Sequence, residues 1–186
     1  MGPGPLRDTV RAVVDANAGP IRATTLGAKL LQLCLPGVPD TYQGCEVVDL
    51  SLVDPDNRRP VDFEARARRL DRLAHGPATD LDDEKMLVTT RALHLRRADP
   101  EAFGMGATYR PLQTTSEHAL GFLRSDRVAA VVTRAPARLA AAGGWGDTAL
   151  DLPEGRWHDV LTGLDTDGRL ADLLAVHPVA LLVRKD

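Results

Sequence analysis

Apolar residues recur at helical spacing through the first hundred residues. In residues 6–18 and 22–34, leucine and valine return every three or four positions, which predicts two helices. The same spacing predicts a helix over residues 62–74, with Asp62 as its N-cap, and another over residues 83–98. The residues expected on the buried faces of these last two helices include Phe63, Leu70, Leu73, Leu87 and Leu93.

One short apolar run lies between the second and third helices. Residues 38–43 predict a strand, and residues 44–61 predict an extended polar loop. A single strand flanked by helices is not a sheet, because its backbone groups need hydrogen-bond partners on both sides. We therefore expect residues 1–100 to be the last part of a larger α/β domain, and the chain to be a fragment.

Beyond residue 100 the pattern changes to short β-forming runs separated by turn residues. These runs are Tyr109–Thr115, His118–Arg124, Val128–Thr133, Ala149–Leu152, Trp157–Leu161 and Val179–Arg184. Their spacing is typical of an all-β unit. We therefore expect residues 101–186 to form a small antiparallel β-sandwich.

Composition narrows the class of protein. The 186 residues are 44% hydrophobic and 26% charged, which is ordinary for a soluble globular protein. The net charge of −3 is evenly spread, so the sequence does not suggest a basic surface for nucleic-acid binding. The sequence has no apolar run long enough for a membrane span and no secretory signal at its start. Cys34 and Cys45 lack the spacing of a zinc site or a disulfide framework. We expect a cytoplasmic protein without metal or cofactor, with Cys34 in the core.

Two charged clusters lie in the helical half. The basic cluster is Arg66, Arg68, Arg69 and Arg72, and the acidic run is Asp80, Asp82, Asp83 and Glu84. Acidic neighbours offset the arginines, so a solvated helix face is favoured over a phosphate site. The acidic run lacks the ligand spacing of a calcium loop and is expected to cap the next helix.

The polar loop carries side chains suited to binding a sugar. Asp54 and Arg58 lie four residues apart, where a carboxylate can accept from two adjacent hydroxyls while the guanidinium donates to them. Asp56, Asn57 and Arg59 are further candidates. The alternative is that these acids form turns around the proline and pair with the arginines, which would hold the loop together.

Four other residues invite an interpretation. Tyr42 can stack on a sugar or belong to the core, and Glu46 can contact a hydroxyl or support the loop. Trp145 can serve as a glycan platform, but the glycines around it favour a tight turn with its ring inward. Trp157 is expected in the core.

The segment around the predicted strand resembles a known family. Residues 36–46, PGVPDTYQGCE, resemble the eighth barrel strand of the α-amylase superfamily. Residues 49–62, DLSLVDPDNRRPVD, narrow the resemblance to the maltooligosyl trehalose synthase family. The similarity continues through the β-rich half, for example at AAAGGWGDT in residues 140–148. Cys45 departs from this family, which usually has threonine there.

The resemblance implies a fold and an activity. The fold would be the helices and last strand of a (β/α)8 barrel, followed by the β-sandwich. The activity would be intramolecular transglucosylation of a maltooligosaccharide, turning its reducing-end α-1,4 linkage into the α,α-1,1 linkage of trehalose. Asp54 and Arg58 match a DPxxR pattern that relatives use to bind glucose.

No segment resembles the motifs of the superfamily's catalytic carboxylates. We expect those groups on an upstream barrel of the same polypeptide, which makes that barrel a partner of this chain alongside the α-glucan substrate. The chain by itself is expected to be inactive. The alternative is a non-catalytic carbohydrate-binding or scaffold module.

Overall fold

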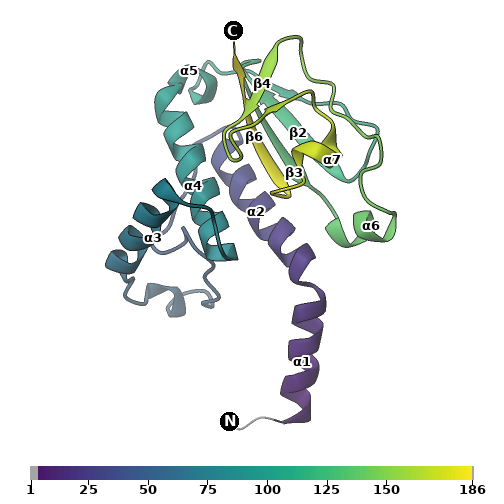
Figure 1. The fold of residues 1–186 in the computed structure, drawn as a ribbon. Coiled ribbons are helices and arrows are strands. Elements are labelled where there is room, and N and C mark those ends of the chain that lie inside the picture. Colours follow the sequence, from purple (N-terminus) through teal and green to yellow (C-terminus); the bar gives the residue numbers. More distant parts are fainter. Residues whose placement is uncertain (1–3, 186) are drawn as a thin grey trace.

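The computed structural model describes residues 4–185, in which a helical layer packs against a single sheet (Figure 1). The helices are α1 (Pro5–Ala16), α2 (Ala18–Cys34), α3 (Phe63–His75), α4 (Leu81–Ala98), α5 (Pro100–Phe103), α6 (Pro136–Ala141) and α7 (Leu170–Leu173), with a 3₁₀ turn, η1, at Asp56–Arg58. The four long helices confirm the predictions from hydrophobic spacing. Within these residues, no helix combines the length and the hydropathy needed to cross a membrane.

The sheet has six strands, all antiparallel to their neighbours. They are β1 (Tyr109–Pro111), β2 (Ala119–Arg124), β3 (Val128–Thr133), β4 (Arg156–Asp159), β5 (Asp165–Thr166) and β6 (Val179–Lys185). The spatial order is β1-β2-β3-β6-β4-β5, so the last strand in the sequence is inserted at the centre of the sheet. β3 and β6 therefore have neighbours on both sides.

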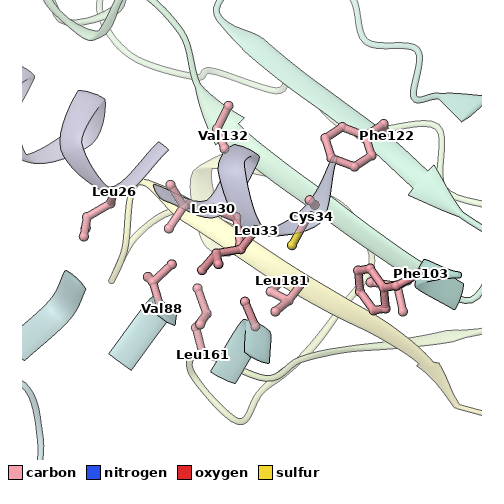
Figure 2. Packing of buried hydrophobic residues seen from close by; sticks show 14 of the residues in the cluster. Leu26, Leu30, Leu33, Cys34, Val88, Phe103, Phe122, Val132, Leu161 and Leu181 are labelled. Carbon is pink, nitrogen blue, oxygen red and sulfur yellow. The ribbon is translucent and has the colours of Figure 1, made fainter. Parts of the chain in front are cut away.

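One face of the sheet is covered by helices. Leu26, Leu30 and Leu33 of α2 pack with Val132 of β3 and Leu181 of β6, and all five are buried (Figure 2). Helices α4 and α5 extend the same apolar cluster. Cys34 lies in it too, as predicted, and burial raises the pKa of its thiol to about 12. This cluster joins the helical half to the sheet.

A second apolar cluster lies on the opposite face of the sheet. Ala129 and Val131 of β3 point there and pack with Leu170 of α7. Trp157 is buried on this face and donates its indole N–H to the Pro153 carbonyl at 2.9 Å, which confirms its prediction as core. The partly buried Trp145 packs against the same cluster, as its glycine-rich turn predicted.

Two predictions about strands are wrong. Residues 38–43 form no strand, and Val38 is 96% exposed. An extended segment becomes a strand only when a neighbour takes up its hydrogen bonds, and no strand of the described chain lies beside it. The predicted sandwich is replaced by one sheet, because helices rather than a second sheet cover the face formed by Val128, Ala130 and Val132.

The domain boundary near residue 100 stays a prediction, as does the assignment of residues 1–100 to a barrel. The first apolar cluster contains residues from both sides of that boundary. Helix α1 differs from the rest because it has no buried residue and projects away from the body (Figure 1). Leu6, Val10, Val13 and Val14, which give it its apolar stripe, are each more than half exposed.

Candidate functional site

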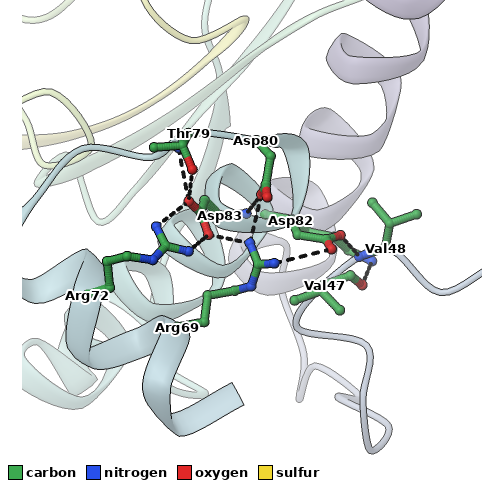
Figure 3. Close-up of polar contacts among 9 residues, drawn as sticks. Val47, Val48, Arg69, Arg72, Thr79, Asp80, Asp82 and Asp83 are labelled. Atoms are coloured by element: carbon green, nitrogen blue, oxygen red, sulfur yellow. Dashed lines mark hydrogen bonds and ion pairs between the residues drawn. The ribbon is translucent and has the colours of Figure 1, made fainter. Parts of the chain in front are cut away.

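The polar loop is fixed at its start by the first turns of α4. Val47 is buried between α3 and α4. The peptide group between Val47 and Val48 is hydrogen-bonded at both ends. The Val48 N–H donates to Asp82 Oδ1 at 2.9 Å, and Lys85 Nζ donates to the Val47 carbonyl at 2.6 Å. Figure 3 shows Val48 beside Asp82 at this point. Helix α4 therefore sets where the loop begins.

A buried carboxylate ties α3 to α4 nearby (Figure 3). Asp83 is fully buried and accepts two bonds from Arg72, at 2.6 and 2.8 Å, and one from Arg69. It also accepts from the Thr79 N–H at 2.9 Å and hydroxyl at 2.8 Å. These bonds, with Arg72 foremost, hold the pKa of Asp83 well below its usual range. Asp80 caps α4 by accepting from the Asp83 N–H at 2.7 Å.

This network corrects one prediction and confirms another. Arg69 and Arg72 do not lie on a purely solvated face, because both bind the carboxylate that α4 buries. The acidic run does cap α4, with Asp80 as the capping residue. The network therefore holds α3 against the first turn of α4, where Asp82 binds the start of the polar loop.

At the tip of the loop, four of the predicted sugar ligands pair with one another. Asp54 forms an ion pair with Arg58, and Asp56 forms one with Arg59. Asp56 also accepts from the Leu52 N–H at 2.8 Å. Its pKa is lowered first by the bond from Arg59 and then by this backbone bond. The structure thus shows the alternative arrangement, in which these charges hold the loop together.

The ion pairs at the tip remain open to solvent. The side chains of Arg58 and Asp54 are 68% and 58% exposed, and that of Arg59 is 66% exposed. Exposed ion pairs of this kind contribute only about 0–1 kcal/mol, so a ligand can replace one partner at little cost.

In and beside the loop, several polar atoms are buried without a hydrogen-bond partner. They are Glu46 Oε2, Asn57 Oδ1, Thr41 Oγ1 and Arg66 Nε, four of the six such side-chain atoms in residues 4–185. Glu46 and Asn57 were predicted site residues, whereas Thr41 and Arg66 were not. Their only signal in the sequence is that they flank the loop. Unpartnered buried polar groups are costly and call for a partner from outside.

Apolar side chains surround the loop and are also exposed. Tyr42 is 47% exposed, so it is not core, and it lines an open groove with Lys29 and Lys85. Other exposed apolar residues before, within and just after the loop include Val38, Leu50, Leu52, Val53 and Phe63. Within residues 4–185, no group of three or more histidine, cysteine or acidic residues is arranged to hold a metal.

Comparisons with known proteins match this arrangement to one family. No family model matches the chain. A curated Mycobacterium tuberculosis protein named as a maltooligosyl trehalose synthase is 42% identical over 186 residues, covering 97% of this chain and 23% of that protein. The solved maltooligosyltrehalose synthase from Arthrobacter ramosus is 45% identical with a TM-score of 0.92, covering 99% of this chain and 25% of that one. The chain is homologous to a segment of maltooligosyl trehalose synthases.

The match confirms the family resemblance given by the loop sequence. A further solved maltooligosyl trehalose synthase is 25% identical with a TM-score of 0.70 over 96% of this chain. The chain spans about a quarter of the length of the maltooligosyl trehalose synthases it matches. Because the A. ramosus enzyme matches helices and sheet together, their packing against each other is common to both proteins.

Proposed function

We propose that this chain supplies a substrate-binding loop and the sheet-bearing part of a maltooligosyl trehalose synthase. The parent enzyme would convert the reducing-end α-1,4 linkage of a maltooligosaccharide into the α,α-1,1 linkage of trehalose. The observation that carries this proposal is the match of almost the whole chain, exposed polar loop included, to one segment of such enzymes.

The proposed reaction needs groups that this chain does not provide. Intramolecular transglucosylation with retention requires a carboxylate nucleophile and a nearby acid/base group, about 5–5.5 Å apart. We assign neither role to a residue of this chain and place both in an upstream barrel of the same polypeptide. The contribution of this chain is to bind and orient the glucan and to help exclude water, which would otherwise hydrolyse the glycosyl-enzyme.

Asp54 and Arg58 would make the principal sugar contacts. Their ion pair orients a carboxylate and a guanidinium side by side at the exposed tip of the loop. A glucose unit can take both partners at once, since vicinal hydroxyls donate to the carboxylate and accept from the guanidinium. Asp56, Arg59 and Asn57 would extend this polar rim.

Glu46 and Tyr42 would act at the base of the loop. The buried Glu46 Oε2 lacks a hydrogen-bond partner and can accept from a sugar hydroxyl. The half-exposed ring of Tyr42 is available for stacking. The exposed apolar residues around the loop, such as Val38 and Leu50, would be covered by the barrel of the parent protein.

The test uses Asp54→Ala in a full-length enzyme. We expect KM for maltopentaose to rise about tenfold, because a charge-assisted hydrogen bond contributes roughly 1.5–3 kcal/mol. We also expect a larger share of hydrolysis, measured as free glucose against trehalose product. Asp71→Ala, which removes an exposed carboxylate from α3, is the matched control and should leave both quantities unchanged.

Two results would count against the proposal. If Asp54→Ala matches the control while the protein stays folded, Asp54 does not contact the sugar. If the 186-residue chain alone converts maltopentaose, the catalytic carboxylates do not lie upstream. A non-catalytic carbohydrate-binding module would instead bind maltopentaose without any product, with or without the barrel.

A further inference from the structure

The segment between the end of α2 and the polar loop is held mainly by side chains from other elements. Residues 37–48 contain Tyr42 and Glu46, and they form neither a helix nor a strand. Among residues 4–185, the only backbone–backbone hydrogen bond of this segment joins the Cys45 N–H to the Tyr42 carbonyl at 3.2 Å. A segment with so few bonds of its own keeps one conformation only where other groups bind its backbone.

Arg96 of α4 binds the start of this segment. Its guanidinium donates to the Leu33 carbonyl at 2.9 Å and to the Gly37 carbonyl at 3.1 Å. Leu33 lies in the last turn of α2, where carbonyls have no partner within the helix, and α2 has no basic residue of its own in that turn. The same guanidinium lies 4.8 Å from the centre of the Phe103 ring. Arg96 therefore joins the end of α2 to the bend that leads into the segment.

Lys85 of the same helix binds the end of the segment. Its Nζ donates to the Val47 carbonyl at 2.6 Å, and Val47 is buried. Lys85 itself is half-buried, so this bond is partly shielded from water. Both cations thus donate to backbone carbonyls, one near each end of residues 37–48.

The two anchors lie on one stripe of α4. Lys85 and Arg96 are eleven residues apart, which is close to three helical turns and about 16 Å along the axis. Thr89 lies between them on this stripe and is buried. Asp82, almost one turn before Lys85, extends the stripe by accepting from the Val48 N–H at 2.9 Å (Figure 3). One rigid helix therefore sets the spacing between the points where the segment is held.

We propose that Arg96 and Lys85 are positioning residues for glucan binding, which hold the two ends of residues 37–48 and thereby place Tyr42 and Glu46 against the substrate. This role rests on the proposed function, in which Tyr42 and Glu46 contact the sugar. Neither cation has to reach the substrate, since each acts through backbone carbonyls. A misplacement of about 1 Å can cost roughly 100-fold in rate, so a small shift of the segment is enough to be measured.

The anchoring bonds join groups of this chain to each other, so they do not depend on which surfaces the rest of a longer protein covers. The much longer A. ramosus enzyme matches 99% of this chain with a TM-score of 0.92. The relative placement of α2, α4 and the segment is therefore suited to a test in a full-length enzyme.

The first test measures amide hydrogen exchange in peptides that span residues 38–48 of a full-length enzyme. We expect Arg96→Met and Lys85→Met each to speed this exchange about tenfold, because each variant loses donors that hold the segment. Arg97→Met removes an exposed charge from the same helix and should leave exchange unchanged. Arg96→Lys keeps the charge but loses the planar fork, so its exchange should lie between those of the parent and Arg96→Met.

The second test measures maltopentaose kinetics with the same variants. We expect KM to rise roughly three- to tenfold, and the share of free glucose over trehalose product to rise, because a displaced segment binds glucan and excludes water less well. A merely structural role would lower kcat through loss of folded enzyme and leave KM unchanged. Leu170→Ala, at a buried position on the opposite face of the sheet, should lower Tm without changing KM or the product ratio.

The outcomes separate this inference from the proposed function. Unchanged exchange in both methionine variants, or an equal change in Arg97→Met, overturns the anchoring. Faster exchange with an unchanged KM overturns the link to the substrate. If Asp54→Ala raises KM and neither methionine variant does, the proposed function stands and this inference fails.

If the parent enzyme forms no trehalose, the proposed function fails and the substrate role of the two cations fails with it, whereas the exchange rates still decide the anchoring. If one methionine variant does not fold, the other decides, because each removes the anchor at a different end of the segment.

Discussion

At the scale of single residues, burial of one carboxylate organises the helical layer. Asp83 has no exposed surface and receives bonds from Arg69, Arg72 and Thr79. Such a group stabilises the fold only while all its partners are present, because an unpaired buried charge costs more than the pair contributes. Residues 80–84 contain four acids, and local pattern does not distinguish Asp83 from the other three as the one to be buried.

Replacing this carboxylate should destabilise the chain strongly. We expect Asp83→Ala to lower the free energy of unfolding by about 3 kcal/mol, since Arg72 loses its carboxylate partner, Arg69 loses one of its partners, and the backbone N–H of Thr79 loses an acceptor. Urea unfolding followed by circular dichroism measures this change. Asp71→Ala, on the exposed face of α3, should stay within about 0.5 kcal/mol of the parent chain. Equal effects of the two substitutions would show that the network is not stabilising.

At the scale of elements, α2 and α1 have opposite roles despite similar apolar spacing. Helix α2 crosses β3 closely, since a Cβ added at Gly27 would lie 3.5 Å from the Cβ of Val132. Its leucines are buried by the sheet, whereas the valines of α1 meet solvent. Periodicity shows that a helix has an apolar face, but not what covers that face.

This contrast predicts unequal effects of the same kind of truncation. Leu30→Ala should lower the free energy of unfolding by about 2–5 kcal/mol, because it leaves a cavity between α2 and the sheet. Val13→Ala on α1 should change it by less than about 0.5 kcal/mol, because that side chain is 59% exposed. Thermal unfolding of both variants measures the difference. A large loss from Val13→Ala would mean that α1 is packed against something in solution.

At the scale of the whole molecule, acid should destabilise the fold. The folded pKa of Asp83 is far below its ordinary value of 3.8, so the unfolded chain binds more protons than the folded one in acid. The stabilisation from Asp83 is therefore present above about pH 4 and is lost as the pH falls below that value. Asp159 acts in the opposite sense, because burial raises its pKa and its protonation favours the fold.

The acid response can be measured as Tm between about pH 7 and about pH 2. We expect Tm to fall steeply below about pH 4 in the parent chain and to fall less steeply in Asp83→Asn, which cannot lose that charge. Asp71→Asn should follow the parent curve. Parallel curves for the parent and Asp83→Asn would show that this carboxylate does not control the acid response.

The amino-acid sequence by itself determined the four long helices, most of the strands and the family, because these depend on local spacing and on a contiguous motif at residues 49–62. It could not decide whether residues 38–43 pair as a strand, since that depends on a neighbour distant in the sequence. It also left open whether Asp54 and Arg58 bind each other or a sugar. The tertiary structure decided these points: Asp54 and Arg58 form an ion pair, and Asp83 is buried. It also decided that helices, rather than a second sheet, cover one face of the sheet. In each case the reason is the same. Burial and pairing depend on side chains from elements distant in the sequence, and a local sequence pattern carries no information about those neighbours.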